Sequence, residues 1–170
     1  MPFVVEDGTG KADATAYLTV AAADAYAADH TTPTGWGAAL SATKEAAIRA
    51  ATDFLDRQYA GAWRGRPWSS TQRLAWPRGG VVLDGYELSA SPLPRQLLEA
   101  CAEVAFKSFL GEALMADVAD PSRIVSESVA VGPISKSVTY AGAKASAAYW
   151  RTVESLVAPL LSDSDIVGRG

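Results

Sequence analysis

The chain has 170 residues, of which 49% are hydrophobic and 20% charged, as expected for a folded protein with a sizeable core. Its formal net charge of −4 argues against the uniformly basic surface that binds duplex DNA. A single cysteine excludes an intrachain disulfide framework, and no apolar run has the length that a membrane-spanning helix needs.

The first part of the chain predicts a short extended segment and two helices. The β-prone residues 3–5 end at the turn signal Glu6-Asp7-Gly8. Thr19 is a suitable N-cap for a helix through about Asp29, because its hydroxyl can accept from an unpaired amide of the first turn. Apolar residues recur at helical spacing over residues 42–59, after a Ser41 cap.

Two further helices are expected. Pro94 is suited to the first turn of a helix that extends to about residue 116. Its apolar residues cover most of its circumference, and only Glu99, Glu103 and Lys107 mark a polar face. The last helix should cover about residues 145–158, where Pro159 ends or kinks it.

Between these helices, alternating residues predict extended structure. The stretch RIVSESVAVGPISKSVTY favours a β-hairpin or two extended arms around Gly132-Pro133, within about residues 123–140. The expected fold is therefore mainly α, a bundle of about four helices with a long loop and this hairpin. We expect one domain over residues 1–170, with a helical core at about 17–120 and 145–161 and a C-terminal tail at 162–170.

Several residues that could carry catalysis have simpler explanations. His30 lies at a predicted helix end, where a cation complements the helix dipole. Cys101 lies in the apolar stripe of its helix and is interpreted as a small core residue. Gly8-Thr9-Gly10-Lys11-Ala12 lacks the first glycine and the hydroxyl of a phosphate-binding loop. Asp53 and Asp56, together with Lys44, are expected to face water. We therefore expect no enzyme, no metal and no cofactor.

The most unusual segment is QYAGAWRGRPWSSTQRLAWPRGG, residues 58–80, which is rich in tryptophan and arginine and contains no acid. Basic grooves with aromatic platforms are typical of single-strand binders. The alternative is structural: buried tryptophans with arginine stems packed over them. The residues alone favour the structural interpretation. The aromatic candidates are Trp63, Trp68 and Trp76, and the basic candidates are Arg64, Arg66, Arg73 and Arg78.

Several motifs in one order resemble a known family. They are VEDGTG at 5–10, YLTVAAADAY at 17–26, KEAAIRAATDFLD at 44–56, QRLAWPRGGV at 72–81 and VSESVAVGPISKSVTY at 125–140. Together they resemble the neck, or head–tail connector, proteins of tailed bacteriophages. Some relatives of that family carry the label of DnaT-like proteins that bind single-stranded DNA.

The resemblance implies a structural protein of the virion, made in the host cytoplasm. It would form a homo-oligomeric ring of about twelve subunits that joins the portal protein to the next neck or tail-completion protein. The four arginines would face an acidic neighbour or genomic DNA in the lumen, and no membrane is involved. The three tryptophans would organise the subunit, and the tail residues Ile166, Val167 and Arg169 would dock on the portal.

Two other functions are left open. The first is a module that binds single-stranded DNA through the same tryptophans and arginines. The second is an internal regulatory protein that has no place in the virion.

Overall fold

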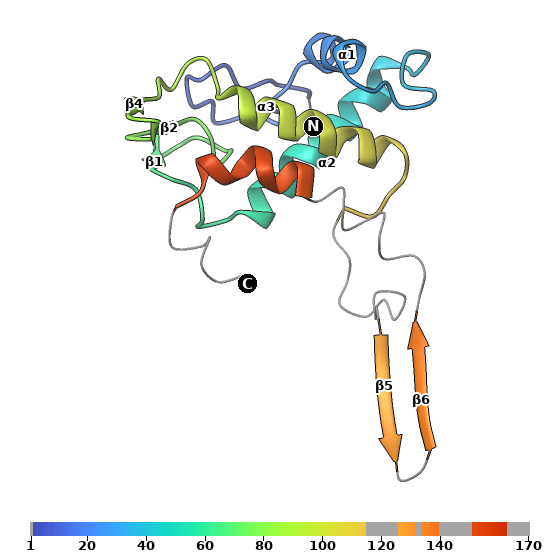
Figure 1. The fold of residues 1–170 in the computed structure, drawn as a ribbon. Helices are drawn as coiled ribbons and strands as arrows, with labels where there is room; N and C mark the ends of the chain where they lie inside the picture. The colour runs from blue at the N-terminus through green and yellow to red at the C-terminus, as the bar shows by residue number, and fades with distance from the viewer. Residues whose placement is uncertain (1, 115–125, 132–133, 140–150, 163–170) are drawn as a thin grey trace.

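A computed structural model describes residues 2–114, 126–131, 134–139 and 151–162 (Figure 1). Its helices are α1 (Val20–Asp29), α2 (Ser41–Gln58) and α3 (Arg95–Phe109), and residues 151–157 are also helical and run into a 3-10 turn, Ala158–Leu160. The strands pair antiparallel as β1 (Arg66–Pro67) with β2 (Arg78–Gly79), β3 (Val82–Leu83) with β4 (Tyr86–Glu87), and β5 (Ser126–Val131) with β6 (Ile134–Thr139).

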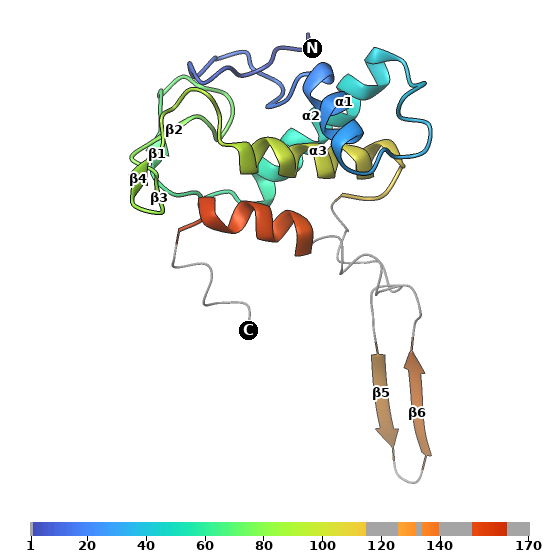
Figure 2. The same ribbon diagram turned by 45° about the horizontal axis from the view of Figure 1, so that its top comes forward.

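The centre of the core lies between α2 and α3, which pack against each other, whereas α1 touches both only locally. Residues 151–157 lie alongside these helices in both views (Figure 2). Three apolar side chains of this segment and the 3-10 turn are fully buried in the same core, those of Val153, Val157 and Leu160, and Leu156 is partly buried against it. The prediction of a mainly α fold is confirmed in the sense of a helix-rich chain with small hairpins, but a four-helix bundle is not established.

The helix starts show one correct cap prediction and one wrong one. Thr19 caps α1, since its Oγ1 accepts from the amide of Ala22 at 3.0 Å. Ser41 does not cap α2, because it is the first helical residue and Leu40 occupies the N-cap. The Ser41 hydroxyl instead donates to Glu45 one turn later, at 3.3 Å.

Helix α3 ends earlier than predicted. Gly111 has φ +77°, and the amides of Gly111 and Glu112 donate to the carbonyls of Ser108 and Lys107. This is the Schellman arrangement, in which a left-handed glycine stops the helix. The apolar pattern continued beyond Gly111, so the prediction that the helix reaches residue 116 missed this stop.

Lys44 was expected in water but is buried. Its Nζ lies 2.8 Å from Oδ1 of Asp24 and 5.4 Å from the centroid of the Trp36 ring. The Trp36 indole N–H donates to the same Asp24 oxygen at 2.7 Å. The ion pair and the aromatic ring offset the cost of removing the Lys44 ammonium from water. The partner carboxylate lies 20 residues away in the sequence.

The predicted hairpin is confirmed as the antiparallel pair β5 and β6, whose register runs from Ser126 opposite Thr139 to Val131 opposite Ile134. The last helix is seen from residue 151 onward, and Pro159 lies in the 3-10 turn that follows it. Among the described residues, none of the helices combines the length and the apolar character needed to cross a bilayer.

The long loop after α2 contains the two smallest sheets. Gly65, just before β1, has φ +68°, and a Cβ there would lie 2.4 Å from the carbonyl oxygen of Gly79. Glycine is therefore needed for the close approach of β1 to β2. An amide–carbonyl bond of 2.8 Å from Leu88 to Val81 links β4 to the start of β3.

Candidate functional site

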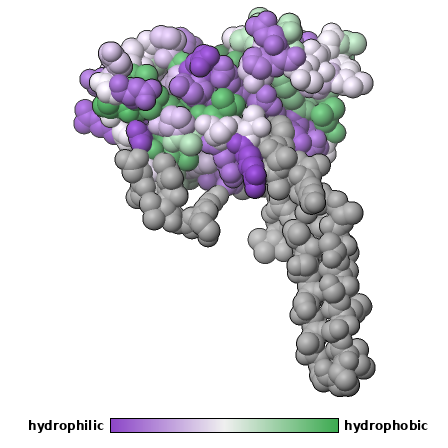
Figure 3. All heavy atoms as spheres, in the orientation of Figure 1, coloured by the Kyte–Doolittle hydropathy of each residue, from purple (hydrophilic) through white to green (hydrophobic). Residues whose placement is uncertain are grey.

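The sheets β1–β2 and β3–β4 surround an open groove of about 1100 Å³ at one end of the molecule. The space-filling view shows hydrophilic and hydrophobic residues mixed at this end (Figure 3). The groove is lined by β1 with the positions on either side of it, by two further glycines, and by the end of β4 with the loop that follows: Gly65, Arg66, Pro67, Trp68, Gly79, Gly80, Glu87, Leu88, Ser89 and Ala90.

Trp68 supplies the aromatic surface of this groove. Its side chain is 58% exposed, and its amide donates to the carbonyl of Pro77 at 3.1 Å. The ring lies against Gly79, where an added Cβ would be 3.3 Å from ring atom Cε3. Gly79, which has no side chain, thus contacts the Trp68 indole and leaves much of the ring exposed to solvent.

Trp63 and Trp76 are buried, unlike Trp68. They are 5% and 1% exposed, and their rings meet edge to face with centroids 5.9 Å apart. Both belong to the core, where Tyr59 adds a further ring contact with Trp63 at 5.4 Å. The expectation that all three tryptophans organise the subunit therefore does not describe Trp68, because its ring packs on a surface sheet.

The arginines also divide into two groups. Arg78 donates to three carbonyls, those of Arg64, Gly65 and Ala75, and its partial burial lowers the pKa of its guanidinium. Arg64 donates to the carbonyls of Leu161 and Val82. Both guanidinium groups hold backbone segments together and are thereby fixed in place.

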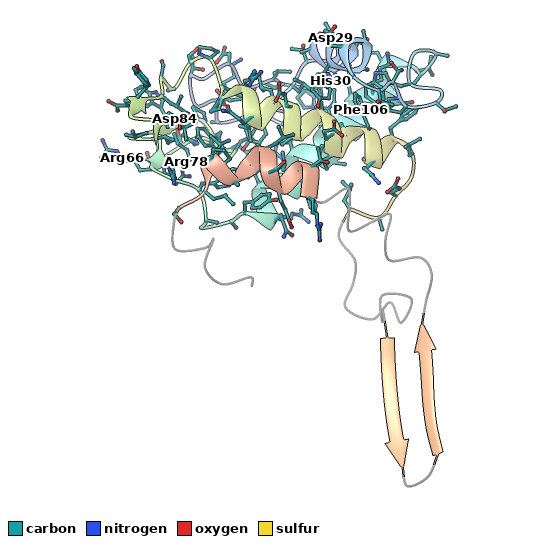
Figure 4. The ribbon with its side chains drawn as sticks, viewed as in Figure 1. Asp29, His30, Arg66, Arg78, Asp84 and Phe106 are labelled. Atoms are coloured by element: carbon teal, nitrogen blue, oxygen red, sulfur yellow. The ribbon has the colours of Figure 1, made fainter. Side chains whose placement is uncertain are left out.

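Arg66 and Arg73 are exposed, and of these two only Arg66 lines the groove. Arg66 points outward from the molecule beside Arg78 (Figure 4). The backbone amide of Arg73 donates to the carbonyl of Lys11 at 3.1 Å, so this residue belongs to a neighbouring turn. The structure thus brings Arg66 and Trp68 together at one groove and places Arg73 outside its lining.

A partly buried carboxyl group, that of Asp56, joins α2 to two other segments of the chain. Asp56 accepts from the Tyr17 hydroxyl through Oδ1 and from the Ala75 amide through Oδ2, the latter at 3.0 Å. The Tyr17 oxygen in turn accepts from the Trp76 amide at 3.1 Å. Burial raises the pKa of Asp56. The expectation that Asp56 faces water is wrong, because its hydrogen-bond partners come from two other segments of the chain.

A buried carboxylate, that of Glu6, organises the turn that packs against the loop after β4. Glu6 accepts from the amides of Asp7, Gly8 and Gly10 through Oε1 and from the amide of Lys11 through Oε2. A Cβ on Gly8 would lie 2.5 Å from Cβ of Ser91. The VEDGTG motif therefore builds a tight turn against the loop that continues from the groove wall.

Sequence reasoning missed Glu87 and the glycines of the groove. The sequence does contain a signal for the β3–β4 hairpin, the dipeptide Asp84-Gly85, which is typical of tight hairpins. It lies between Val82-Leu83 and Tyr86-Glu87. It would have predicted the β3–β4 pair and placed Glu87 on a strand. The Tyr86 side chain on the same strand is 79% exposed.

The remaining candidates lie away from the groove. Cys101 is fully buried, as expected for a core residue, and burial raises the pKa of its thiol to about 12. His30 is exposed, with Nδ1 3.0 Å from the carbonyl oxygen of Tyr26. Ile166, Val167 and Arg169, the predicted portal-docking tail, lie outside the described residues. Within the described ranges, no cluster of three or more His, Cys, Asp or Glu residues could hold a metal.

Comparison with known proteins gives one match. A family model described as "Putative DnaT-like ssDNA binding protein" matches residues 1–169. Searches of curated proteins and of solved structures found no match.

This match contradicts the prediction of a phage neck connector, together with the ring and portal partners that it implied. The contacts around the motifs explain why they did not distinguish the two functions. Glu6, Asp56 and Trp76 all belong to motifs that suggested the connector, and all three form internal contacts. Such residues specify the fold of the subunit and say little about its partners.

Proposed function

The chain belongs to the DnaT-like family of ssDNA-binding proteins, and on this premise we propose that it binds single-stranded DNA in the groove beside Trp68. The proposed function is binding, without a catalytic step. The groove has a volume of about 1100 Å³, just above the range of pockets for small ligands, and its open shape suits a polymer that enters and leaves.

The observation that carries the proposal is the exposure of Trp68. Trp36, Trp63 and Trp76 are at most 5% exposed, so Trp68 is the accessible indole among the described residues. Aromatic side chains bind single strands by stacking on the faces of bases, which contributes about 1–3 kcal/mol per base. A base within a duplex already has both faces stacked on its neighbours, so this contact favours a single strand.

Arg66 supplies positive charge beside this ring. It is exposed and lines the groove together with Trp68 two residues later. Gly80 leaves the backbone open beside these residues, since an added Cβ there would have no atom within 4 Å, and a strand can approach it closely. One cation, one aromatic platform and an open backbone surface are elements typical of grooves that bind single strands.

The test is the affinity of the full chain for labelled oligo-dT, measured by fluorescence anisotropy at near-physiological salt. Trp68→Ala should weaken binding by a factor of roughly 5 to 150, the equivalent of one stacked base. Trp68→Phe keeps an aromatic face and should bind within a few-fold of the wild type. Leu40→Ala is the control, because Leu40 is a 76% exposed apolar side chain beside α2.

Intrinsic fluorescence provides an independent readout of the same contact. The wild type should show tryptophan quenching that saturates with oligo-dT, and Trp68→Phe should lose most of it while still binding. Equal affinities of the wild type and Trp68→Ala would contradict the proposal.

A further inference from the structure

The groove contains one acidic side chain, and its position suggests a role in choosing bases. The polar side chains in the lining are those of Arg66, Glu87 and Ser89. The Ser89 hydroxyl donates to the carbonyl of Ser91 at 2.8 Å and is engaged in the loop. Glu87 is exposed and has no hydrogen-bond or ion-pair partner among the described residues, so its carboxylate can accept from a ligand.

The two charged groups belong to different walls. Arg66 lies on β1, opposite Gly79 of β2, whereas Glu87 lies on β4, opposite Val82 of β3. The Leu88–Val81 hydrogen bond holds the second wall next to the glycines that separate the two. A phosphate is attracted to Arg66 and repelled by Glu87. A nucleotide stacked on Trp68 therefore has its phosphate toward β1 and its base edge toward β4.

We propose that Glu87 selects bases that carry an exocyclic amino group, so that the groove prefers cytosine over thymine. A carboxylate accepts from the N4 amino group of cytosine, whereas thymine presents the O4 carbonyl at the same place. Adenine carries a comparable donor at N6. Cytosine and thymine form the cleaner comparison, since both are pyrimidines. This inference rests on the proposed binding of single strands in the same groove.

The experiment compares anisotropy titrations of labelled oligo-dC and oligo-dT of equal length with the full chain. The wild type should bind oligo-dC at least about fivefold more tightly, the lower end of what a good base contact discriminates. Glu87→Gln presents both a donor and an acceptor, and it should bring the two affinities together. The ratio of affinities is the readout, because removing a negative charge strengthens binding to any strand and cancels in the ratio.

Asp84→Asn is the matched control. Asp84 is an exposed acid in the β3–β4 turn, three residues before Glu87, and it is not part of the groove lining (Figure 4). Its φ of 50° is one that asparagine adopts readily, so the substitution removes charge without straining the turn. Asp84→Asn should keep the oligo-dC preference of the wild type.

The outcomes separate the two proposals. Equal affinities of the wild type for oligo-dC and oligo-dT, or a preference that Glu87→Gln leaves unchanged, would overturn the role of Glu87 while single-strand binding stands. Absence of binding to either oligonucleotide would overturn the proposed function, and the inference with it.

Discussion

At the residue scale, the ionisable group with the widest structural role is the carboxyl of Asp56. It joins α2 to the N-terminal segment through Tyr17 and to the tryptophan–arginine segment through Ala75. Neither partner could be read from the spacing of residues within α2. A carboxyl group that accepts from two distant segments determines how those segments meet, and a substitution there should affect stability before it affects binding.

Asp56→Asn should destabilise the fold by about 1–3 kcal/mol, because an amide has one acceptor oxygen where the carboxylate has two, so the Tyr17 hydroxyl or the Ala75 amide loses its acceptor. Chemical denaturation of the wild type and the variant measures this difference. Asp53→Asn is the control, since it removes the same charge from an exposed position on the same helix. If Asp56→Asn were as stable as Asp53→Asn, the structural role of Asp56 would be contradicted.

The difference in stability between the wild type and Asp56→Asn should depend on pH, and its direction follows from the raised pKa of Asp56. Burial raises the pKa of Asp56 in the folded chain above its ordinary value of 3.8, so the folded state binds this proton more tightly than the unfolded state. The resulting stabilisation is complete below pH 3.8 and is lost as the pH rises through the raised pKa. Asparagine does not titrate, so the advantage of the wild type over Asp56→Asn should shrink from acid toward neutral pH.

At the element scale, β1 and β2 are short strands whose pairing shapes the groove. Their register places Arg66 opposite Gly79, and the amide of Trp68 extends the ladder to Pro77. This pairing places the Trp68 ring over Gly79 at the surface, while Trp76, before β2, enters the core. The exposure of one indole and the burial of the other are thus consequences of the strand register.

Gly65→Ala should separate these strands. The new Cβ would meet the Gly79 carbonyl oxygen at 2.4 Å and a Val81 methyl at 2.8 Å, in addition to the strain of φ +68°. Gly61→Ala is the matched control, because Gly61 has φ +79° and no atom within 4 Å of an added Cβ. The control should lose only the roughly 1–2 kcal/mol of a left-handed alanine.

Stability and oligo-dT affinity, measured on both variants, distinguish the two effects. Gly65→Ala should lose more stability than Gly61→Ala and should also bind oligo-dT more weakly than the wild type. Equal losses of stability in the two variants would show that the close approach of β1 and β2 is unimportant.

Local signals predicted the elements better than they predicted the site. Thr19 and Pro94 marked helix starts correctly, because capping and proline effects act within one turn, although Pro94 is the N-cap of α3 and not part of its first turn. The burial of Lys44 depends on Asp24 in another helix and could not follow from the pattern of α2. The tryptophan–arginine composition singled out the segment that lines part of the groove, but the strand pairing decided that Trp68 is exposed.

At the scale of the whole molecule, charge is concentrated in the segment that forms the groove. Residues 57–80 contain five arginines and no acid within a chain of net charge −4. Arg64 and Arg78 are engaged with carbonyl oxygens, which leaves few cations to meet phosphates. Binding should therefore depend on salt only modestly, and more on stacking than on charge.

This expectation can be measured as the slope of log affinity against log salt concentration. Each phosphate neutralised on a single strand contributes about −0.7 to the slope. Arg66→Ala should reduce its magnitude by about 0.7. Arg151→Ala should not change it, because Arg151 lies in the helical segment 151–157, at the end away from Leu160, whose carbonyl accepts from the Arg64 amide. Equal slopes for the wild type and Arg66→Ala would exclude Arg66 from phosphate contact.

The contacts between residues 62–64 and 160–162 also determine when the groove can form. The Arg64 amide donates to Leu160, the Ser162 amide donates to Ala62, and Trp63 bridges to Leu161. During synthesis, the segment before β1 leaves the ribosome about a hundred residues before these partners. A chain that ends before residue 160 lacks these hydrogen bonds to residues 62–64. Translation must therefore pass residues 160–162 before the segment next to β1 has all of its contacts.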